Sequence, residues 1–152
     1  MVLGEQHDRT YSYRLSREHI LALGLFDILS VPSRIEDQIW DSIEERDPPP
    51  ETVALFGPIA RREAAPDDDV DVLVVRPDVV RHENLAWCTQ FGELERMVEE
   101  RTGNRVHLVE VDQSELTRAV DTNQPLIESL RADARTVFGT ELRVRLGSQG
   151  TR

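Results

Sequence analysis

The segment LFGPIARREAAPDDDVDVLVV, residues 55–75, decides the fold prediction, because an apolar strand, a glycine turn and a second apolar strand follow one another within it. Successive side chains of a strand point to opposite faces of a sheet. Asp69 and Asp71 therefore share one face, while Val70 and Val72 point into a core on the other. Mg²⁺ prefers oxygen ligands and often takes one or two carboxylates together with water and substrate phosphates. The segment predicts metal-dependent phosphoryl chemistry.

The turn between the two strands carries residue types that suit phosphate binding. Gly57 has no Cβ, so backbone N–H groups can approach a triphosphate closely. Residues 59–62 are expected to open a helix, whose N-terminus favours anions. Arg61 and Arg62 each offer a guanidinium group for bidentate phosphate contacts.

Together these residues resemble the motif of the minimal nucleotidyltransferases, a family of the DNA polymerase beta superfamily. That motif reads Gly-Ser-x-Ala-Arg-Gly-Glu-Ala, a short turn, and then Ser-Asp-Ile-Asp-Leu. The matching segments here are GPIARREA, residues 57–64, and DDVDVL, residues 68–73. The resemblance, which covers residues 52–138, implies that Asp69 and Asp71 hold Mg²⁺, or Mn²⁺ in its place. It also implies that Gly57 lies beside a nucleoside triphosphate.

The fold expected from this resemblance is an α/β (α+β) nucleotidyltransferase fold, with a small mixed β-sheet and helices packed mainly on one face. Strands separated by helices along the chain favour the same layered class. Strands are expected at residues 52–56, from Asp69 to Val75, at 105–111 and at 136–138. Helices are expected at residues 83–101, 115–120 and 125–134.

Three positions of the motif depart from the family. Pro58 replaces the serine that contacts phosphate, and it has neither a hydroxyl group nor a backbone N–H. Arg62 replaces the second glycine, and Asp68 replaces the serine before the first aspartate. The nucleotide-binding residues implied by the resemblance are thus Gly57, Pro58, Arg61 and Arg62.

A fourth departure affects the third carboxylate of catalytically competent relatives. In the segment RVHLVEV, residues 105–111, His107 stands where the family has an acid. A histidine can accept a proton and serve as a general base, so Asp69, Asp71 and His107 are the candidate catalytic residues. The alternative is that His107 is a packed, hydrogen-bonded strand residue. Glu110 lies three residues further on, which places it on the opposite face of a regular strand.

The aspartates also have a structural interpretation. The run from Asp67 to Asp69 is typical of a solvated turn, in which side chains bond to their own backbone. Asp71 is harder to explain in this way, because it interrupts a strongly apolar strand. A carboxylate there is costly unless it is paired, metal-bound or open to a cleft.

The N-terminal part, residues 1–46, is predicted to hold a strand at 9–15 and a helical segment that is interrupted at Pro32. A capping box, SRIE, precedes the second helix.

The run HDRTYSYRLSREH, residues 7–19, resembles the wing strand and exit segment of winged-helix domains fused ahead of nucleotidyltransferase domains in some bacterial proteins. The alternative is a strand at the edge of the main sheet. Residues 47–146 are predicted to be the nucleotidyltransferase domain, and residues 147–152 a mobile tail.

The composition sets limits on the function. A net charge of −11 opposes strong non-specific binding to nucleic acid. The single cysteine, Cys88, excludes an intramolecular disulfide, and its helical spacing between Trp87 and Phe91 predicts a buried thiol. No apolar run is long enough to span a bilayer, and no secretory signal is recognisable, so the expected location is cytoplasmic with no membrane partner.

Two functions follow from these observations. The first is a Mg²⁺-dependent nucleotidyltransferase that transfers a nucleoside monophosphate to a hydroxyl group of an unknown acceptor, which is RNA, a protein or a small molecule. The second is a catalytically degenerate binding module: a nucleotide sensor, an antitoxin-like partner or a fragment of a transcriptional regulator. Pro58, the missing third acid and the acidic surface favour the second, and a homodimer or a protein partner is compatible with both.

Overall fold

The computed structural model describes residues 2–7, 10–15, 18–65 and 67–147, and the chain divides into two compact units, residues 1–34 and 35–152. In the first unit, two strands form a two-stranded antiparallel sheet, and a short helix follows: β1 (Val2–His7), β2 (Thr10–Leu15) and α1 (Ala22–Leu29). The predicted strand at 9–15 is thus one half of a hairpin. Its resemblance to a wing stays a prediction, as do the domain bounds proposed from the sequence.

Helix α2 (Val31–Glu44) begins before the predicted capping box. Pro32 stands in its first turn, where a missing backbone N–H costs nothing. The proline therefore belongs to the start of the helix and does not interrupt it ahead of Ser33. Ile35, Ile39 and Ile43 form a buried stripe along α2 at helical spacing.

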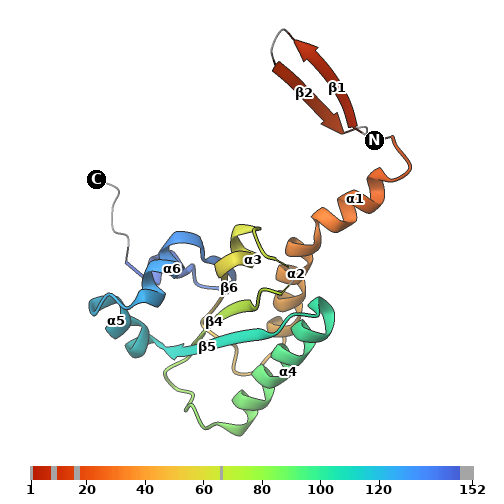
Figure 1. The fold of residues 1–152 in the computed structure, drawn as a ribbon. Coiled ribbons are helices and arrows are strands. Elements are labelled where there is room, and N and C mark those ends of the chain that lie inside the picture. The colour runs from red at the N-terminus through yellow and green to blue at the C-terminus, as the bar shows by residue number, and fades with distance from the viewer. Residues whose placement is uncertain (1, 8–9, 16–17, 66, 148–152) are drawn as a thin grey trace. The chain divides into compact units, whose positions relative to one another are not determined.

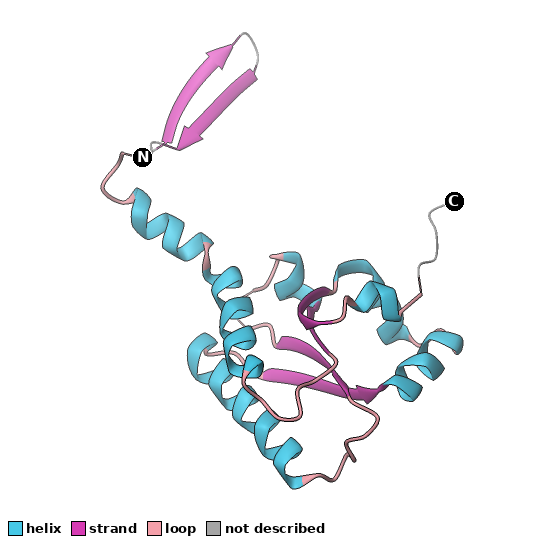
Figure 2. Ribbon diagram, turned by 180° about the vertical axis from the view of Figure 1, so that it is seen from behind, coloured by secondary structure: helices cyan, strands magenta, loops and turns pink. Residues whose placement is uncertain are grey.

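The second unit is built on a four-stranded mixed sheet with the order β5-β4-β3-β6 (Figures 1 and 2). Its strands are β3 (Thr52–Phe56), β4 (Val70–Arg76), β5 (Val106–Asp112) and β6 (Arg135–Gly139). Strands β4 and β5 run parallel, whereas β3 is antiparallel to both β4 and β6. The expected α/β class and the mixed sheet are confirmed.

The helices of the second unit are α3 (Gly57–Arg61), α4 (Leu85–Thr102), α5 (Gln113–Asp121), α6 (Pro125–Asp133) and α7 (Leu142–Arg145). Two of their ends follow the sequence signals. Gly103 ends α4 in the left-handed conformation that favours glycine, and Asp112 with Glu115 forms a capping box at the start of α5. The last short helix, α7, was not expected.

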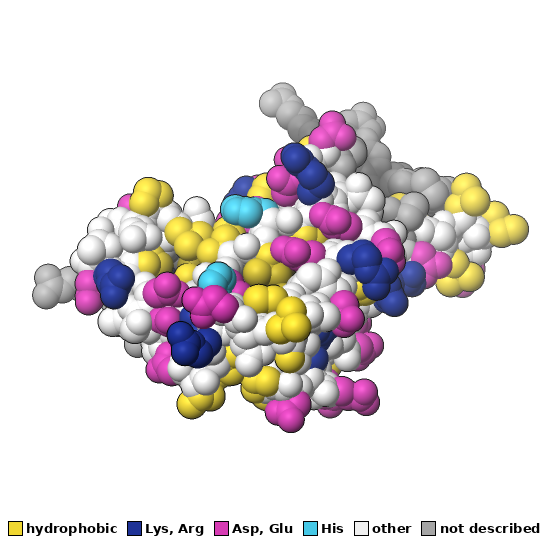
Figure 3. Space-filling view, turned by 90° about the horizontal axis from the view of Figure 1, so that it is seen from below, with side chains coloured by type: hydrophobic (Ala, Val, Ile, Leu, Met, Phe, Trp, Pro, Cys, Tyr) yellow, Lys and Arg dark blue, Asp and Glu magenta, His cyan; other side chains and the backbone are white. Residues whose placement is uncertain are grey.

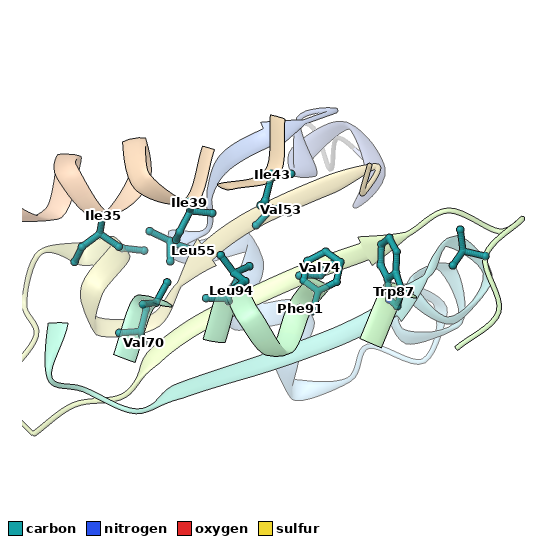
Figure 4. Close-up of a cluster of buried hydrophobic side chains, with 14 residues drawn as sticks. Ile35, Ile39, Ile43, Val53, Leu55, Val70, Val74, Trp87, Phe91 and Leu94 are labelled. Atoms are coloured by element: carbon teal, nitrogen blue, oxygen red, sulfur yellow. The ribbon is translucent and has the colours of Figure 1, made fainter. Parts of the chain in front are cut away.

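Helices cover both faces of the sheet, whereas the sequence predicted helices packed mainly on one face. Val70, Val72 and Val74 of β4 pack with side chains of α2 and α4, as Figure 4 shows for most of this cluster. Leu73 and Val75 point the other way and pack with Leu116 and Ala119 of α5, Ile127 and Leu130 of α6, and Leu142 and Leu146 near the C-terminus. The central strands are therefore apolar on both sides, as expected for strands buried between two layers.

Helix α4 illustrates how spacing selects the buried face. Trp87, Phe91, Leu94 and Val98 are buried, and each fully buried large side chain contributes roughly 1.5–3 kcal/mol of apolar transfer free energy. Cys88 is exposed, which corrects the prediction of a buried thiol. It follows Trp87 by one position and so lies about 100° around the helix from the inward stripe.

Among the residues that the structure describes, none of the helices combines the length and apolar character that a bilayer crossing demands. The predicted mobile tail lies, apart from Gly147, outside the described residues.

Candidate functional site

Asp71 is the second residue of β4, and its neighbours on both adjacent strands define the site. Its register partners are Phe56 on β3 and His107 on β5. By strand alternation it lies on the same face as Leu73, toward α5 and α6. Its side chain is 20% exposed, whereas the apolar residues that flank it in β4 are fully buried. The carboxylate thus lies near the end of the sheet where β4 begins, with limited access to solvent.

Gly57 approaches Asp71 so closely that a larger residue at its position would force the Asp71 side chain to shift. It follows β3 directly and has a φ of +70°, in the left-handed region. A Cβ built on Gly57 would lie 2.3 Å from Oδ2 of Asp71. The glycine turn therefore lies directly beside the second carboxylate of the motif.

His107 contacts the same carboxylate from the neighbouring parallel strand. Its Nδ1 lies 3.0 Å from Oδ1 of Asp71, and its side chain is 64% exposed. Asp71 therefore has one oxygen toward His107 and the other toward Gly57. The structure brings these three predicted site residues together.

Glu110 lies on the opposite face of β5 from His107, as the three-residue offset predicts. Its Oε1 accepts a hydrogen bond from Nε of Arg76 at 2.7 Å and lies 3.2 Å from Nδ1 of His82. Arg76 also pairs with Asp112 at 3.3 Å. Glu110 thus belongs to a partly buried ion-pair network around Arg76 and does not supply the third carboxylate of the site.

Asp69 lies just before β4 and pairs with a different partner. Its Oδ1 is 3.4 Å from Nε of Arg105, and its side chain is 41% exposed. Asp68 belongs to the preceding turn, where its Oδ2 accepts a hydrogen bond from the backbone N–H of Ala65 at 2.7 Å. Asp68 thus lies in a turn, as the composition of the acidic run predicts. Asp69 leads from this turn into β4.

Arg61 is held by two carboxylates in the folded chain. Its Nε donates to Oε2 of Glu63 at 3.1 Å, and its Nη1 pairs with Oδ2 of Asp133. These hydrogen bonds, first the one to Asp133 and then the one to Glu63, raise the pKa of Arg61 above its ordinary value. Arg62 is exposed and adopts the left-handed conformation at the end of α3, with a φ of 62°.

Asp133 is a site residue that sequence reasoning missed. It is the last residue of α6, its side chain is only 5% exposed, and its Oδ1 accepts a hydrogen bond from the backbone N–H of Gly57 at 3.2 Å. An acidic residue at the C-terminal end of a helix opposes the helix dipole. That unfavourable placement is the signal in the sequence that would have singled it out.

Pro58 occupies the first turn of α3, where its fixed φ suits the helix start. Its carbonyl oxygen accepts a hydrogen bond from the N–H of Glu63 at 3.0 Å. Pro58 therefore contributes to both ends of α3, through its ring at the start and its carbonyl oxygen at the end.

A model of the family described as the nucleotidyltransferase domain matches residues 36–137, which is more than half of the chain. The chain belongs to the nucleotidyltransferase domain family. The match contains every predicted site residue and ends within β6. No protein of curated function matches the chain significantly in sequence.

Several solved toxin–antitoxin structures resemble this nucleotidyltransferase domain. A mutant of the MntA–HpeT complex is 17% identical over 73% of this chain and 78% of that chain, with a TM-score of 0.50. A toxin–antitoxin complex with AMP-PNP is 19% identical over 73% of this chain and 78% of that chain, with a TM-score of 0.49. The complex of a tri-AMPylated Shewanella oneidensis HEPN toxin with an MNT antitoxin is 18% identical over 76% of this chain and 79% of that chain, with a TM-score of 0.47. At these identities the likeness concerns the fold alone.

The carboxylates of this nucleotidyltransferase domain suit a hard divalent cation that takes its remaining ligands from elsewhere. The described residues hold no group of three or more His, Cys, Asp or Glu side chains placed to bind a metal ion. They do hold Asp71, whose Oδ2 faces the space that a Cβ on Gly57 would fill. Oxygen donors so placed fit an ion such as Mg²⁺, which keeps water molecules and binds substrate phosphates.

A pocket in the described part of the chain lies beyond the C-terminal end of β4 and is lined by Val79, Arg81, Glu83 and Asn84. None of these is a predicted site residue. The cluster of Gly57, Asp71 and His107 therefore lies apart from the residues that line this pocket.

Proposed function

We propose that this nucleotidyltransferase domain binds a nucleoside triphosphate together with Mg²⁺ or Mn²⁺ and transfers the nucleoside monophosphate to a hydroxyl group of an acceptor. The observation that carries the proposal is the convergence of three elements on one carboxylate. Asp71 meets a glycine turn at one oxygen and a histidine at the other, 3.0 Å away. The left-handed glycine beside one oxygen and the histidine at the other support a functional role for this carboxylate.

Asp69 and Asp71 are the residues that would hold the cation. When bound, it would neutralise the phosphates and stabilise the charge that develops on the leaving pyrophosphate. Both carboxylates have basic partners, Arg105 and His107, in the structure described here. Arg105 is well exposed, so it can move away from Asp69 when a substrate arrives. His107 contacts only Oδ1 of Asp71, which leaves Oδ2 for the cation.

His107 is placed to accept the proton of the acceptor. With the proton on Nδ1 donated to Asp71, the ring leaves Nε2 as an acceptor, a tautomer we assign from this hydrogen bond. The acceptor oxygen forms a bond to the α-phosphorus as the bond to pyrophosphate breaks, and the hydroxyl proton passes to Nε2. The exposed ring allows a large acceptor to approach.

The turn between β3 and α3 is proposed to position the phosphates. The backbone N–H of Gly57 and the guanidinium groups of Arg61 and Arg62 are the donors that this turn would offer, and Pro58 fixes the start of α3. Residues 47–146 would carry the activity, with α2 of the preceding segment packed on their sheet. Residues 1–46 would begin with a wing-like hairpin, and we place the protein in the cytoplasm.

A protein is the first acceptor class to test. The structurally similar MntA–HpeT protein is part of a toxin–antitoxin complex. The chain has a net charge of −11, and its acidic side chains are spread over the face in Figure 3 with basic ones between them. Such a surface suits a basic partner. RNA, a small molecule and a second copy of the chain are the other candidates.

The test uses nucleoside triphosphates that are radiolabelled at the α- or the γ-phosphorus. Each is incubated with the domain, Mg²⁺ and a mixture of proteins and RNA from cells, and the labelled products are separated. We expect the α-label on the acceptor and the γ-label in pyrophosphate, both abolished by EDTA. Transfer of the γ-label would contradict the proposal, and binding without any transfer would favour the non-catalytic binding module.

A further inference from the structure

Asp133 engages two of the three groups that the turn would offer to phosphate, the Gly57 N–H and Arg61. One of its oxygens accepts the backbone N–H of Gly57, 76 residues away in the sequence, and the other pairs with Arg61. The two contacts are made by one carboxylate, so a single anionic group already satisfies a backbone donor and a guanidinium. This is the donor pair that a phosphate would use, because phosphate oxygens bind backbone N–H groups and guanidinium forks in the same way.

The contact is more than a surface ion pair. The Asp133 side chain is 5% exposed, whereas Glu63, the other partner of Arg61, is 69% exposed. Asp133 also lies at the negative end of α6, where a carboxylate is disfavoured. A nearly buried carboxylate at such a place needs compensation, and Arg61 and Gly57 provide it.

We propose that Asp133 is an internal competitor of the nucleotide phosphates, which holds the Gly57 amide and Arg61 until a triphosphate displaces it. The inference rests on the proposed function, since it concerns the same turn. The Gly57 amide has one hydrogen, and a second anion beside the Asp133 carboxylate would be repelled at close range. Phosphate binding therefore requires Arg61 to exchange Asp133 for phosphate.

The experiment compares the affinity of the full chain for ATP, GTP, CTP and UTP, each with Mg²⁺, in the wild type, Asp133→Asn and Glu63→Gln. Asparagine keeps the size of the side chain and removes its charge. Loss of the competitor should tighten binding of the preferred triphosphate about tenfold, as expected when a charged hydrogen bond no longer has to be broken. Glu63→Gln removes the exposed partner of Arg61 and should change the dissociation constant less than about twofold.

Three possible results of this experiment distinguish failure of the competition by Asp133 from failure of the proposed function. Tighter binding by Asp133→Asn supports both. Unchanged or weaker binding, with binding intact in the wild type, overturns the competition and leaves the proposed function standing, because Asp133 would then only position the turn. No binding of any triphosphate by either protein contradicts both.

A measurement on the wild type keeps the inference testable should Asp133→Asn fail to fold. The amide signal of Gly57 and the side-chain carboxyl carbon of Asp133 are followed by NMR while the triphosphate with Mg²⁺ is added. Both signals should shift with one common midpoint as the carboxylate leaves the amide. A shift at Gly57 with an unchanged Asp133 carboxyl signal, or no shift at either, would overturn the competition.

Discussion

Nδ1 of His107 lies 3.0 Å from Oδ1 of Asp71, because the parallel register of β4 and β5 sets these two residues directly beside each other. A slip of one residue would bring Val106 or Leu108 to Asp71 and turn His107 to the other face. The two residues are thus joined by the pairing of the edge strand β5 with β4. The histidine that replaces the family's third acid lies against the carboxylate that is proposed to hold the cation.

His107→Ala should abolish most of the nucleotidyl transfer and leave triphosphate binding nearly intact. Removal of a general base costs about 100-fold or more in rate, whereas the phosphates would bind at the glycine turn and the ring hydrogen-bonds to Asp71. The measurement is the rate of α-label transfer beside the dissociation constant. His82→Ala serves as the control, since that exposed histidine pairs with Glu110 on the other face of β5. Full transfer by His107→Ala would assign the histidine a structural role.

Gly57→Ala should destabilise the domain and disturb the Asp71 carboxylate. A residue with a Cβ is strained at a φ of +70°, at a cost of about 1–3 kcal/mol, and the new methyl group would overlap Oδ2 of Asp71. Urea unfolding gives the free energy of unfolding. Gly92→Ala is the matched control in α4, because a Cβ there meets nothing within 4 Å, and it should stabilise the chain by about 0.5–1 kcal/mol. Equal effects at the two glycines would refute the close approach.

Glu110→Gln should lower the free energy of unfolding by about 1–3 kcal/mol, since it breaks a charged hydrogen bond to a nearly buried arginine. Arg76 keeps its contact with Asp112, which limits the loss. Triphosphate binding should not change, because Glu110 lies on the face away from Asp71. Glu100→Gln breaks an exposed pair with Arg96 and should cost less than about 0.5 kcal/mol. Loss of triphosphate binding in Glu110→Gln would place Glu110 in the site.

Asp112→Ala should remove the N-cap of α5 and lower the free energy of unfolding by about 1 kcal/mol at neutral pH. The N–H of Glu115 and then the hydroxyl of Ser114 hold the pKa of Asp112 below its ordinary 3.8. A lowered pKa means that the fold favours the charged form. The stabilisation is therefore complete above the unfolded-state pKa and is lost as the pH falls through the folded-state pKa.

The stability difference between the wild type and Asp112→Ala should accordingly be constant near pH 7 and narrow below about pH 3.8. Urea unfolding over this pH range measures it. Asp78→Ala, at an exposed loop position, is the control and should give a small difference at every pH. A difference that widens on acidification would contradict the assigned direction.

The features that the sequence predicted best are those determined by residues close together in the chain. Strand β3 lies at the predicted residues 52–56, and the capping box at Asp112 and the glycine end of α4 also lie where expected. Each of these features is encoded by neighbouring residues, through alternation, a cap or a backbone preference. The meeting of Gly57 and Asp71 likewise follows from two strands joined by one turn.

Other features depend on contacts that local pattern does not encode. Amphipathic spacing in α5 and α6 marks which side of each helix is buried, but not which face of the sheet it covers. Both helices pack on the face of the sheet opposite to α2 and α4. Asp133 reaches Gly57 across 76 residues of sequence, and only the packing of α6 beside α3 reveals that contact.

The central claim is that Asp71 holds the divalent cation that accompanies a nucleoside triphosphate. Its most direct test is calorimetric titration of the four nucleoside triphosphates, with Mg²⁺ and with EDTA, into the wild type and Asp71→Asn. Asp67→Asn, at an exposed position of the preceding turn, is the control. The account predicts Mg²⁺-dependent binding in the wild type and in Asp67→Asn, and none in Asp71→Asn. Full binding by Asp71→Asn, or binding by the wild type that EDTA does not affect, would contradict it.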